Sequence, residues 1–143
     1  MTDFFIKSDI SRNDAEKVVS ETLKNCDDGE LYLENSKTEN IVLDDSKIKN
    51  SSYNSDIGYG LRAVTGEIIA YSHSNEISKN SLKNSSENLK STLKSKKGTY
   101  NHSISKSNIK YYEDKNPIEE KSFSSKIKIL EEIDKYTRSK NPN

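Results

Sequence analysis

The spacing of apolar residues changes several times along the chain, and each change predicts a new secondary-structure element. Between residues 15 and 23 the apolar positions recur at helical spacing. They directly follow Ser11 and Asp14, whose separation is typical of a capped helix N-terminus. We therefore expect an amphipathic helix over about 12–25. It is expected to end at residues 26–29, where Gly29 would supply the positive φ that turns a chain out of a helix.

After residue 29 the period of the pattern changes to two, which is typical of strands. Leu31 and Leu33 alternate with polar residues and predict a first strand, and residues 41–43 predict a second strand after a polar break at 35–37. Residues 44–47 are expected to form a turn. The most apolar segments follow and flank the sequence Thr65-Gly66-Glu67, so they predict a β-hairpin formed by residues 57–64 and 68–72.

Two further helices are expected in the second half of the chain. Ser78 is a suitable N-cap for the first of them, and two serines leave its apolar stripe thin. That stripe consists of Leu82, Leu89 and Leu93. Residues 94–116 are predicted to form a loop with a short strand near Ile109. The last helix is expected over about 123–139 behind Ser122, and its apolar stripe consists of Phe123, Ile127, Leu130, Ile133 and Tyr136.

Together these elements predict the α+β class, with one mostly antiparallel sheet of four or five strands and helices packed on one of its faces. A chain of 143 residues has room for one domain, so residues 1–143 are expected to form a single domain. Only 30% of the residues are hydrophobic, which permits one small core under a polar surface. The length excludes an eight-stranded α/β barrel.

The same composition predicts where the protein is found. No segment approaches the roughly 18 continuous apolar residues that a membrane span requires. The first residues carry acids where a signal peptide would carry its basic and apolar regions. We therefore expect a soluble, cytoplasmic protein without a membrane partner.

Charge is balanced overall, with 23 basic and 23 acidic residues, but it is unevenly distributed. Residues 1–45 carry a net charge of −7 and residues 77–110 a net charge of +7. The simplest interpretation is two solvated faces. The alternative is a small anion- or nucleic-acid-binding module, although the acidic first third and the neutral total disfavour nucleic acid as a partner. The basic patch of such a module would consist of Lys79, Lys83, Lys90, Lys94, Lys96 and Lys97.

Candidate catalytic residues are scarce in this sequence. Cys26 is the only cysteine, so it cannot form an intramolecular disulfide, and its place at a helix end favours a buried structural role. His73 has no second histidine within a helical turn, which disfavours a metallopeptidase-type zinc site there. Gly58 and Gly60 lack the third glycine and the following helix of a dinucleotide-binding loop. The residues themselves therefore predict no catalytic or metal-ligating group.

One longer pattern is more specific than any of these. Residues 43–49 are followed by Ile57-Gly58-Tyr59-Gly60-Leu61-Arg62, then by Gly66-Glu67, and then by Ala70-Tyr71-Ser72. In this order the chain resembles the N-terminal domain of the TldD/PmbA family, and residues 60–67 are more similar to its TldD branch. The resemblance covers nearly the whole chain, from the opening helix to an element at 112–117 and a helix at 123–140.

Members of this family are zinc-dependent metalloproteases of the bacterial and archaeal cytoplasm that process small modified peptides and degrade unfolded ones. The resemblance implies a two-subunit assembly around a proteolytic chamber, with zinc held by a His-Glu-x-x-x-His helix. No residue here matches that helix. The resemblance therefore implies a non-catalytic N-terminal domain, inactive by itself and without a cofactor of its own. Its expected partners are a missing catalytic half, a paralogous subunit and a peptide substrate. A remnant without function is a further alternative.

The resemblance also suggests where a peptide would be guided. The strand that contains Gly58, Gly60, Leu61 and Arg62 is expected to help line the chamber, because extended peptides bind by adding to sheet edges. Packing is the favoured interpretation for the glycines, since turns and bulges use glycine without any ligand. Arg62 is the one charged residue in this apolar segment, so it should pair with an acid or reach the surface.

Overall fold

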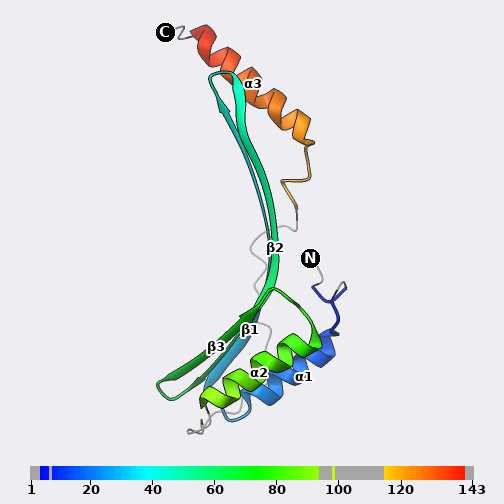
Figure 1. Cartoon of the computed structure of the whole chain (residues 1–143), viewed down its shortest axis with the longest axis vertical. Coiled ribbons are helices and arrows are strands. Elements are labelled where there is room, and N and C mark those ends of the chain that lie inside the picture. Colours follow the sequence, from blue (N-terminus) through cyan, green and yellow to red (C-terminus); the bar gives the residue numbers. More distant parts are fainter. Residues whose placement is uncertain (1–3, 7, 94–97, 99–114, 141–143) are drawn as a thin grey trace. The chain divides into compact units, whose positions relative to one another are not determined.

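The computed structural model describes residues 4–6, 8–93, 98 and 115–140. Its elements follow one another as α1 (Arg12–Leu23), β1 (Asp28–Asp44), β2 (Lys47–Thr65), β3 (Ile68–Ser74), α2 (Lys79–Leu93) and α3 (Phe123–Lys140) (Figure 1). They belong to two compact units. We call Met1–Asn35 with Asp56–Lys110 the core unit, and Ser36–Ser55 with Tyr111–Asn143 the hairpin unit. No helix in the described residues is long and apolar enough to cross a membrane.

The sheet confirms the α+β class, but the described residues form three strands instead of four or five. The strands are antiparallel and adjacent in the order β1-β2-β3. We expected a polar break at residues 35–37 and a hairpin strand from residue 57, yet β1 runs through 35–37 and β2 already begins at Lys47. Hydrophobic periodicity indicates which side chains are buried, and it does not indicate which backbones pair. A hairpin whose side chains are polar is therefore not predicted as strand from this pattern.

The tight turns between the strands use positive φ angles. Asp45 (φ 48°) and Ser46 (φ 57°) connect β1 to β2, and Gly66 (φ 58°) opens the turn from β2 to β3. Positive φ at both central residues of a two-residue hairpin matches the right-handed twist of the flanking strands. Gly29 does not end α1 as expected, because the positive φ lies at Asn25 (φ 67°). A Cβ on Gly29 would lie 2.3 Å from Leu23 Cδ2, so this glycine instead allows β1 to pass close to α1.

Each helix begins behind a serine, as the sequence predicts. The hydroxyl oxygens of Ser11, Ser78 and Ser122 accept hydrogen bonds from the backbone N–H groups three residues later, at 3.1, 3.1 and 3.2 Å. These bonds satisfy donors that have no partner inside the helix. At α1 the Ser11 hydroxyl also donates to the Asp14 carboxylate, and this bond, followed by the charge of Lys79, lowers the pKa of Asp14.

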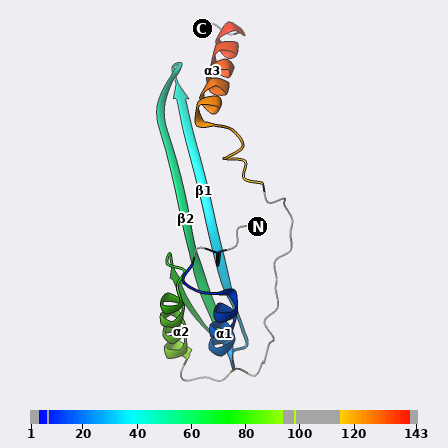
Figure 2. The same cartoon turned by 90° about the vertical axis from the view of Figure 1, so that its right-hand side faces the viewer.

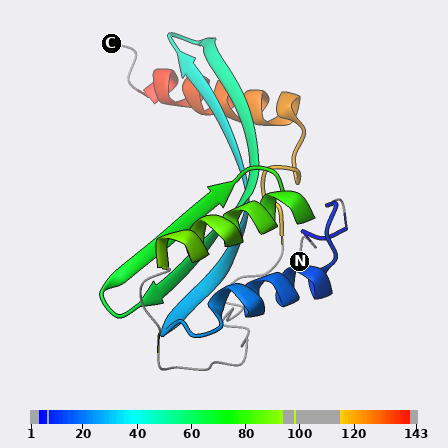
Figure 3. The same ribbon diagram turned by 60° about the horizontal axis from the view of Figure 1, so that its bottom comes forward.

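The core lies in the core unit, between the sheet and two helices. α1 and α2 lie side by side across one face of the sheet (Figures 1 and 3). The sheet side of the core is centred on Leu61 and Ala63, which are fully buried. Leu31 and Leu33 share a face and pack against this core, as expected, and Cys26 is buried. The helices contribute Ala15, Val19, Leu82, Leu89 and Leu93.

The thin apolar stripe of α2 has a structural explanation. Ser85, which is buried, lies 2.9 Å from the Tyr59 hydroxyl and accepts a hydrogen bond from Ser72. The Thr22 hydroxyl of α1 donates to Ser86 at 2.6 Å. A buried hydroxyl needs such partners, because leaving one unpaired costs about 1–3 kcal/mol. Hydroxyl contacts of Ser85 therefore hold α2 against the sheet, and those of Ser86 hold it against α1. A leucine at either position would pack by apolar contact instead.

In the hairpin unit, α3 lies along the β1–β2 hairpin (Figure 2). The contacts between them are polar: the Ser46 hydroxyl donates to Asp134, and Lys126 pairs with Glu39. No residue of α3 is buried. The predicted apolar stripe is therefore wrong as a buried face, since Ile127 and Leu130 are half-buried and the rest of the stripe is exposed. The loop expected at 94–116 and the strand near Ile109 lie almost entirely outside the described residues.

The hydroxyl contacts of Tyr59 can be tested directly. Tyr59→Phe removes the group that bonds Ser81 and Ser85, both at 2.9 Å, so we expect the free energy of unfolding to fall by about 1 kcal/mol. Urea unfolding of the full chain measures this change. Tyr71→Phe, which removes the hydroxyl of an exposed tyrosine, is the matched control and should shift stability by less than about 0.5 kcal/mol. Equal effects of the two changes would contradict the role of the network.

Candidate functional site

The face of the core-unit sheet that α1 and α2 leave uncovered is the main candidate surface, and we call it the outer face. Side chains alternate along a strand, so residues next to the buried Leu61 and Ala70 point to this other side. Opposite partners across β2 and β3 share a face, which places Arg62 with Tyr71 and Gly60 with His73. Tyr32 is exposed between Leu31 and Leu33 on β1. The outer face consists of Tyr32, Gly60, Arg62, Ile69, Tyr71 and His73.

Arg62 is held in place by two carboxylates of β1. Its Nη2 donates to Asp28 at 2.8 Å and its Nε donates to Glu30 at 2.9 Å. The hydrogen bond to Asp28, followed by that to Glu30, raises the pKa of Arg62. The expectation that this charge would pair with an acid or reach the surface is confirmed. Two carboxylates flank one guanidinium, so the pairing orients the side chain across β1 and β2.

An aromatic pair lies beside Arg62. The rings of Tyr71 and His73 stack with centroids 5.8 Å apart. A Cβ on Gly60 would lie 2.6 Å from the Tyr71 hydroxyl, so the absence of a side chain lets the tyrosine lie over the strand. Tyr71 is 64% exposed and Ile69 is 65% exposed. Exposed apolar side chains gathered on one face are typical of a surface that contacts another molecule.

The structure separates the four residues of the expected peptide-guiding strand. Gly60 and Arg62 reach the outer face, and Leu61 is completely buried on the opposite side. A Cβ on Gly58 would lie 2.8 Å from the backbone oxygen of Ser74 on β3. β2 is the central strand, paired with β3 over residues 59–65, so a peptide has no free edge to join there. Contact with a peptide through side chains of the outer face remains a prediction.

The candidate basic patch is only partly described. Lys79, Lys83 and Lys90 lie on α2, and their spacing of four and seven residues puts them on one side of the helix. Lys79 pairs with Asp14 at 3.6 Å. Lys94, Lys96 and Lys97 lie outside the described residues. Binding of an anion or nucleic acid to these lysines stays an untested alternative.

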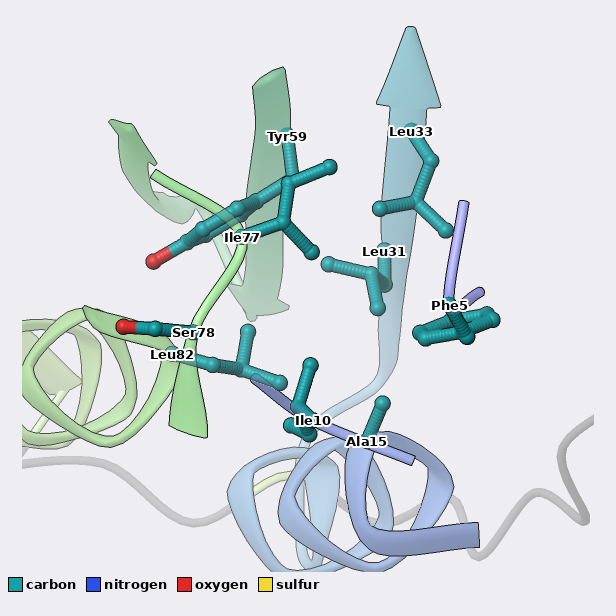
Figure 4. Close-up of a pocket in the computed structure, with 9 residues that line it drawn as sticks. All are labelled: Phe5, Ile10, Ala15, Leu31, Leu33, Tyr59, Ile77, Ser78 and Leu82. Carbon is teal, nitrogen blue, oxygen red and sulfur yellow. The ribbon is translucent and has the colours of Figure 1, made fainter. Parts of the chain in front are cut away.

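Two hollows in the described residues are candidate ligand sites. The first lies between the sheet and the helices of the core unit, where Leu31, Leu33, Ala15 and Leu82 point toward one another (Figure 4). Its volume of about 10 Å³ leaves room for at most one water molecule, so it is a packing gap. The second is an open hollow of about 340 Å³ on the hairpin unit. Its Asp134 carboxylate already accepts bonds from Ser46 and Arg138, which lower the pKa of that carboxyl, the Ser46 bond most.

The described residues do not fit a zinc site. No three His, Cys, Asp or Glu side chains converge among them in a way that could hold a metal ion. His73 is exposed within β3 and stacks on Tyr71. No catalytic step through a metal can be derived from this part of the chain.

Comparison with known proteins decides the family. Residues 29–95 match the sequence model of a family domain described as PmbA/TldA metallopeptidase domain 1. The chain belongs to the TldD/PmbA family. The matched residues correspond to its N-terminal domain, and they comprise nearly all of β1 together with β2, β3 and α2.

Relatives with assigned names agree with this placement. The chain is 37% identical over 103 residues to the metalloprotease TldD homolog of Buchnera aphidicola subsp. Acyrthosiphon pisum, an alignment that covers 71% of this chain and 21% of the relative. It is 33% identical over 122 residues to the metalloprotease TldD homolog of Haemophilus influenzae, with 81% of this chain and 25% of the relative covered. The chain thus spans about a fifth to a quarter of the length of these relatives.

Sequence reasoning missed the aromatic residues of the outer face. Tyr32 and Tyr71 were included in predicted strands, but neither was assigned to a face. A signal was present, since Ile69 and Tyr71 alternate with the small residues Ala70 and Ser72. Strict alternation with Ala70 buried would have placed both large side chains outward.

The two glycines of β2 give a matched test of packing. In Gly58→Ala the new Cβ meets the backbone of β3, which cannot move without separating the strands, so we expect a loss of about 1–3 kcal/mol in the free energy of unfolding. In Gly60→Ala it meets the exposed ring of Tyr71, which can rotate away, so the loss should stay below about 1 kcal/mol. Urea unfolding of both variants compares them. A larger loss for Gly60→Ala would contradict the assignment of the two contacts.

Proposed function

We propose that this chain supplies the N-terminal, non-catalytic domain of a TldD-like metalloprotease that takes part in proteolysis or peptide processing. The observation that carries the proposal is the match of residues 29–95 to the first domain of the family, because these residues form the three-stranded sheet and α2. The named relatives are four to five times longer than the part that this chain matches. The zinc and the catalytic groups then belong to the remaining part of the enzyme.

Within this enzyme, we propose that the outer face contacts peptide. Tyr32, Ile69 and Tyr71 offer exposed apolar surface. Gly60 has no side chain, so the Tyr71 ring can lie across β2 at this position. Arg62 pairs with Asp28 and Glu30, so its side chain is oriented across β1 and β2 and serves to position the surface. Assembly with the catalytic part, or with a paralogous subunit, would bring this face to the peptide.

A hybrid protein tests the proposed function. Residues 1–143 of this chain replace the aligned quarter of the Haemophilus influenzae relative, and the unaltered relative is the control. The hybrid should hydrolyse an unstructured peptide, a metal chelator should stop the reaction, and the 143-residue chain alone should be inactive. Hydrolysis by the chain alone would overturn the proposal. So would a hybrid that fails to fold or to hydrolyse peptide under conditions in which the relative does both.

Contact between the outer face and peptide has its own test in the active hybrid. Tyr71→Ala removes the largest exposed side chain of the face, so we expect KM for the peptide to rise at least threefold with the stability of the hybrid unchanged. Tyr53→Ala, which removes an exposed tyrosine of the hairpin outside the outer face, is the control for general loss of aromatic surface. An unchanged KM in Tyr71→Ala would leave the domain assignment intact and remove the role of this face.

A further inference from the structure

α3 carries two separate apolar faces. Ile127 and Leu130 are half-buried and lie on the side that bears Asp134, which bonds the hairpin through Ser46. Ile129, Ile133 and Tyr136 follow one another at steps of four and three, which places them on one side of the helix roughly 120° away from the middle of the first face. They are 40%, 57% and 66% exposed. We call this second face the α3 stripe.

Within the described residues, α3 buries no side chain completely. It is linked to the hairpin by the partly buried pair Lys126–Glu39, by the exposed pair Arg138–Asp45 and by the Ser46–Asp134 hydrogen bond. An exposed ion pair adds little stability. Most of the stability of a helix in a protein comes from tertiary packing of its apolar face. Burial of the α3 stripe would supply the missing packing.

The occupant of the stripe follows from its size, its charges and its place in the chain. Three partly exposed side chains cannot provide the roughly 800 Å² per partner of a stable dimer, which disfavours a second copy of this chain. Glu132 borders the stripe and Lys140 lies over the Tyr136 ring, so the border is of mixed charge, whereas a helix that lies on an anionic membrane carries basic residues there. α3 follows the family's domain 1, which ends near residue 95, and the relatives continue for at least three quarters of their length outside the match.

We propose that the α3 stripe docks on the part of the TldD-like metalloprotease that follows the N-terminal domain. This inference rests on the proposed function. The partner surface should be an apolar groove of that later part, which receives Ile129, Ile133 and Tyr136 as a helix in a groove. α3 would then be the element by which the N-terminal domain is fixed to the catalytic part of the enzyme.

Thiol labelling tests the docking. Ile133→Cys places a thiol on the stripe, and Lys128→Cys places one about 140° around the helix on the polar side, as the matched control. Each change is made in the 143-residue chain and in the hybrid, and mass spectrometry of the labelled peptides separates the new site from other cysteines. We expect the thiol at position 133 to react at least tenfold more slowly in the hybrid than in the chain alone. The thiol at position 128 should react at similar rates in both.

Each other outcome overturns the inference. Equal rates at position 133 in the two proteins, in a hybrid that hydrolyses peptide, would refute the docking and leave the proposed function standing. Protection of position 133 in the chain alone at raised protein concentration would assign the stripe to a second copy. Protection only after addition of anionic phospholipid vesicles would assign it to a membrane surface. A hybrid that cannot fold would overturn the proposed function and the docking together.

Discussion

The packing of β2 against α1 and α2 is the constraint on which the rest of the core unit depends. Leu61 and Ala63 are fully buried from the central strand, and they meet the apolar residues of both helices. With only 30% hydrophobic residues, the chain has few other side chains to bury. The packing of the sheet against the helices therefore depends largely on small residues. Glycine lets strands and helices approach closely, and serine hydroxyls fill places where an apolar side chain would be usual.

The same constraint gives the outer face its character. Because the buried positions of β2 and β3 point toward the helices, alternation sends Arg62, Ile69 and Tyr71 to the other side. A polar chain would be expected to fill that side with lysine or serine. It carries tyrosines and isoleucine instead, together with an arginine fixed by two acids. This departure from the composition of the chain is what favours the outer face as a contact surface within a larger enzyme.

Sequence patterns predicted the parts of the fold that depend on burial and on capping. Ser11, Ser78 and Ser122 each begin a helix as expected, and Leu31 and Leu33 pack inward. The predictions from these patterns were wrong where the structure depends on backbone pairing or on the close approach of two segments. The polar stretches of β1 and β2 remain strand, and Gly29 accommodates Leu23 instead of ending α1. For the site, pairing of Arg62 was predictable from the cost of an unpaired charge. The pairing of residues 59–65 with β3, which leaves no free edge there, was not predictable, because strand order cannot be read from a single segment.

The core unit packs by itself, whereas α3 is proposed to depend on a surface outside this chain. Native-state hydrogen exchange on the 143-residue chain measures this difference residue by residue. We expect strong protection of backbone amides in β2 near Leu61 and in α2, and exchange close to that of an unfolded peptide along α3. Protection of α3 equal to that of the strand around Leu61 would contradict it.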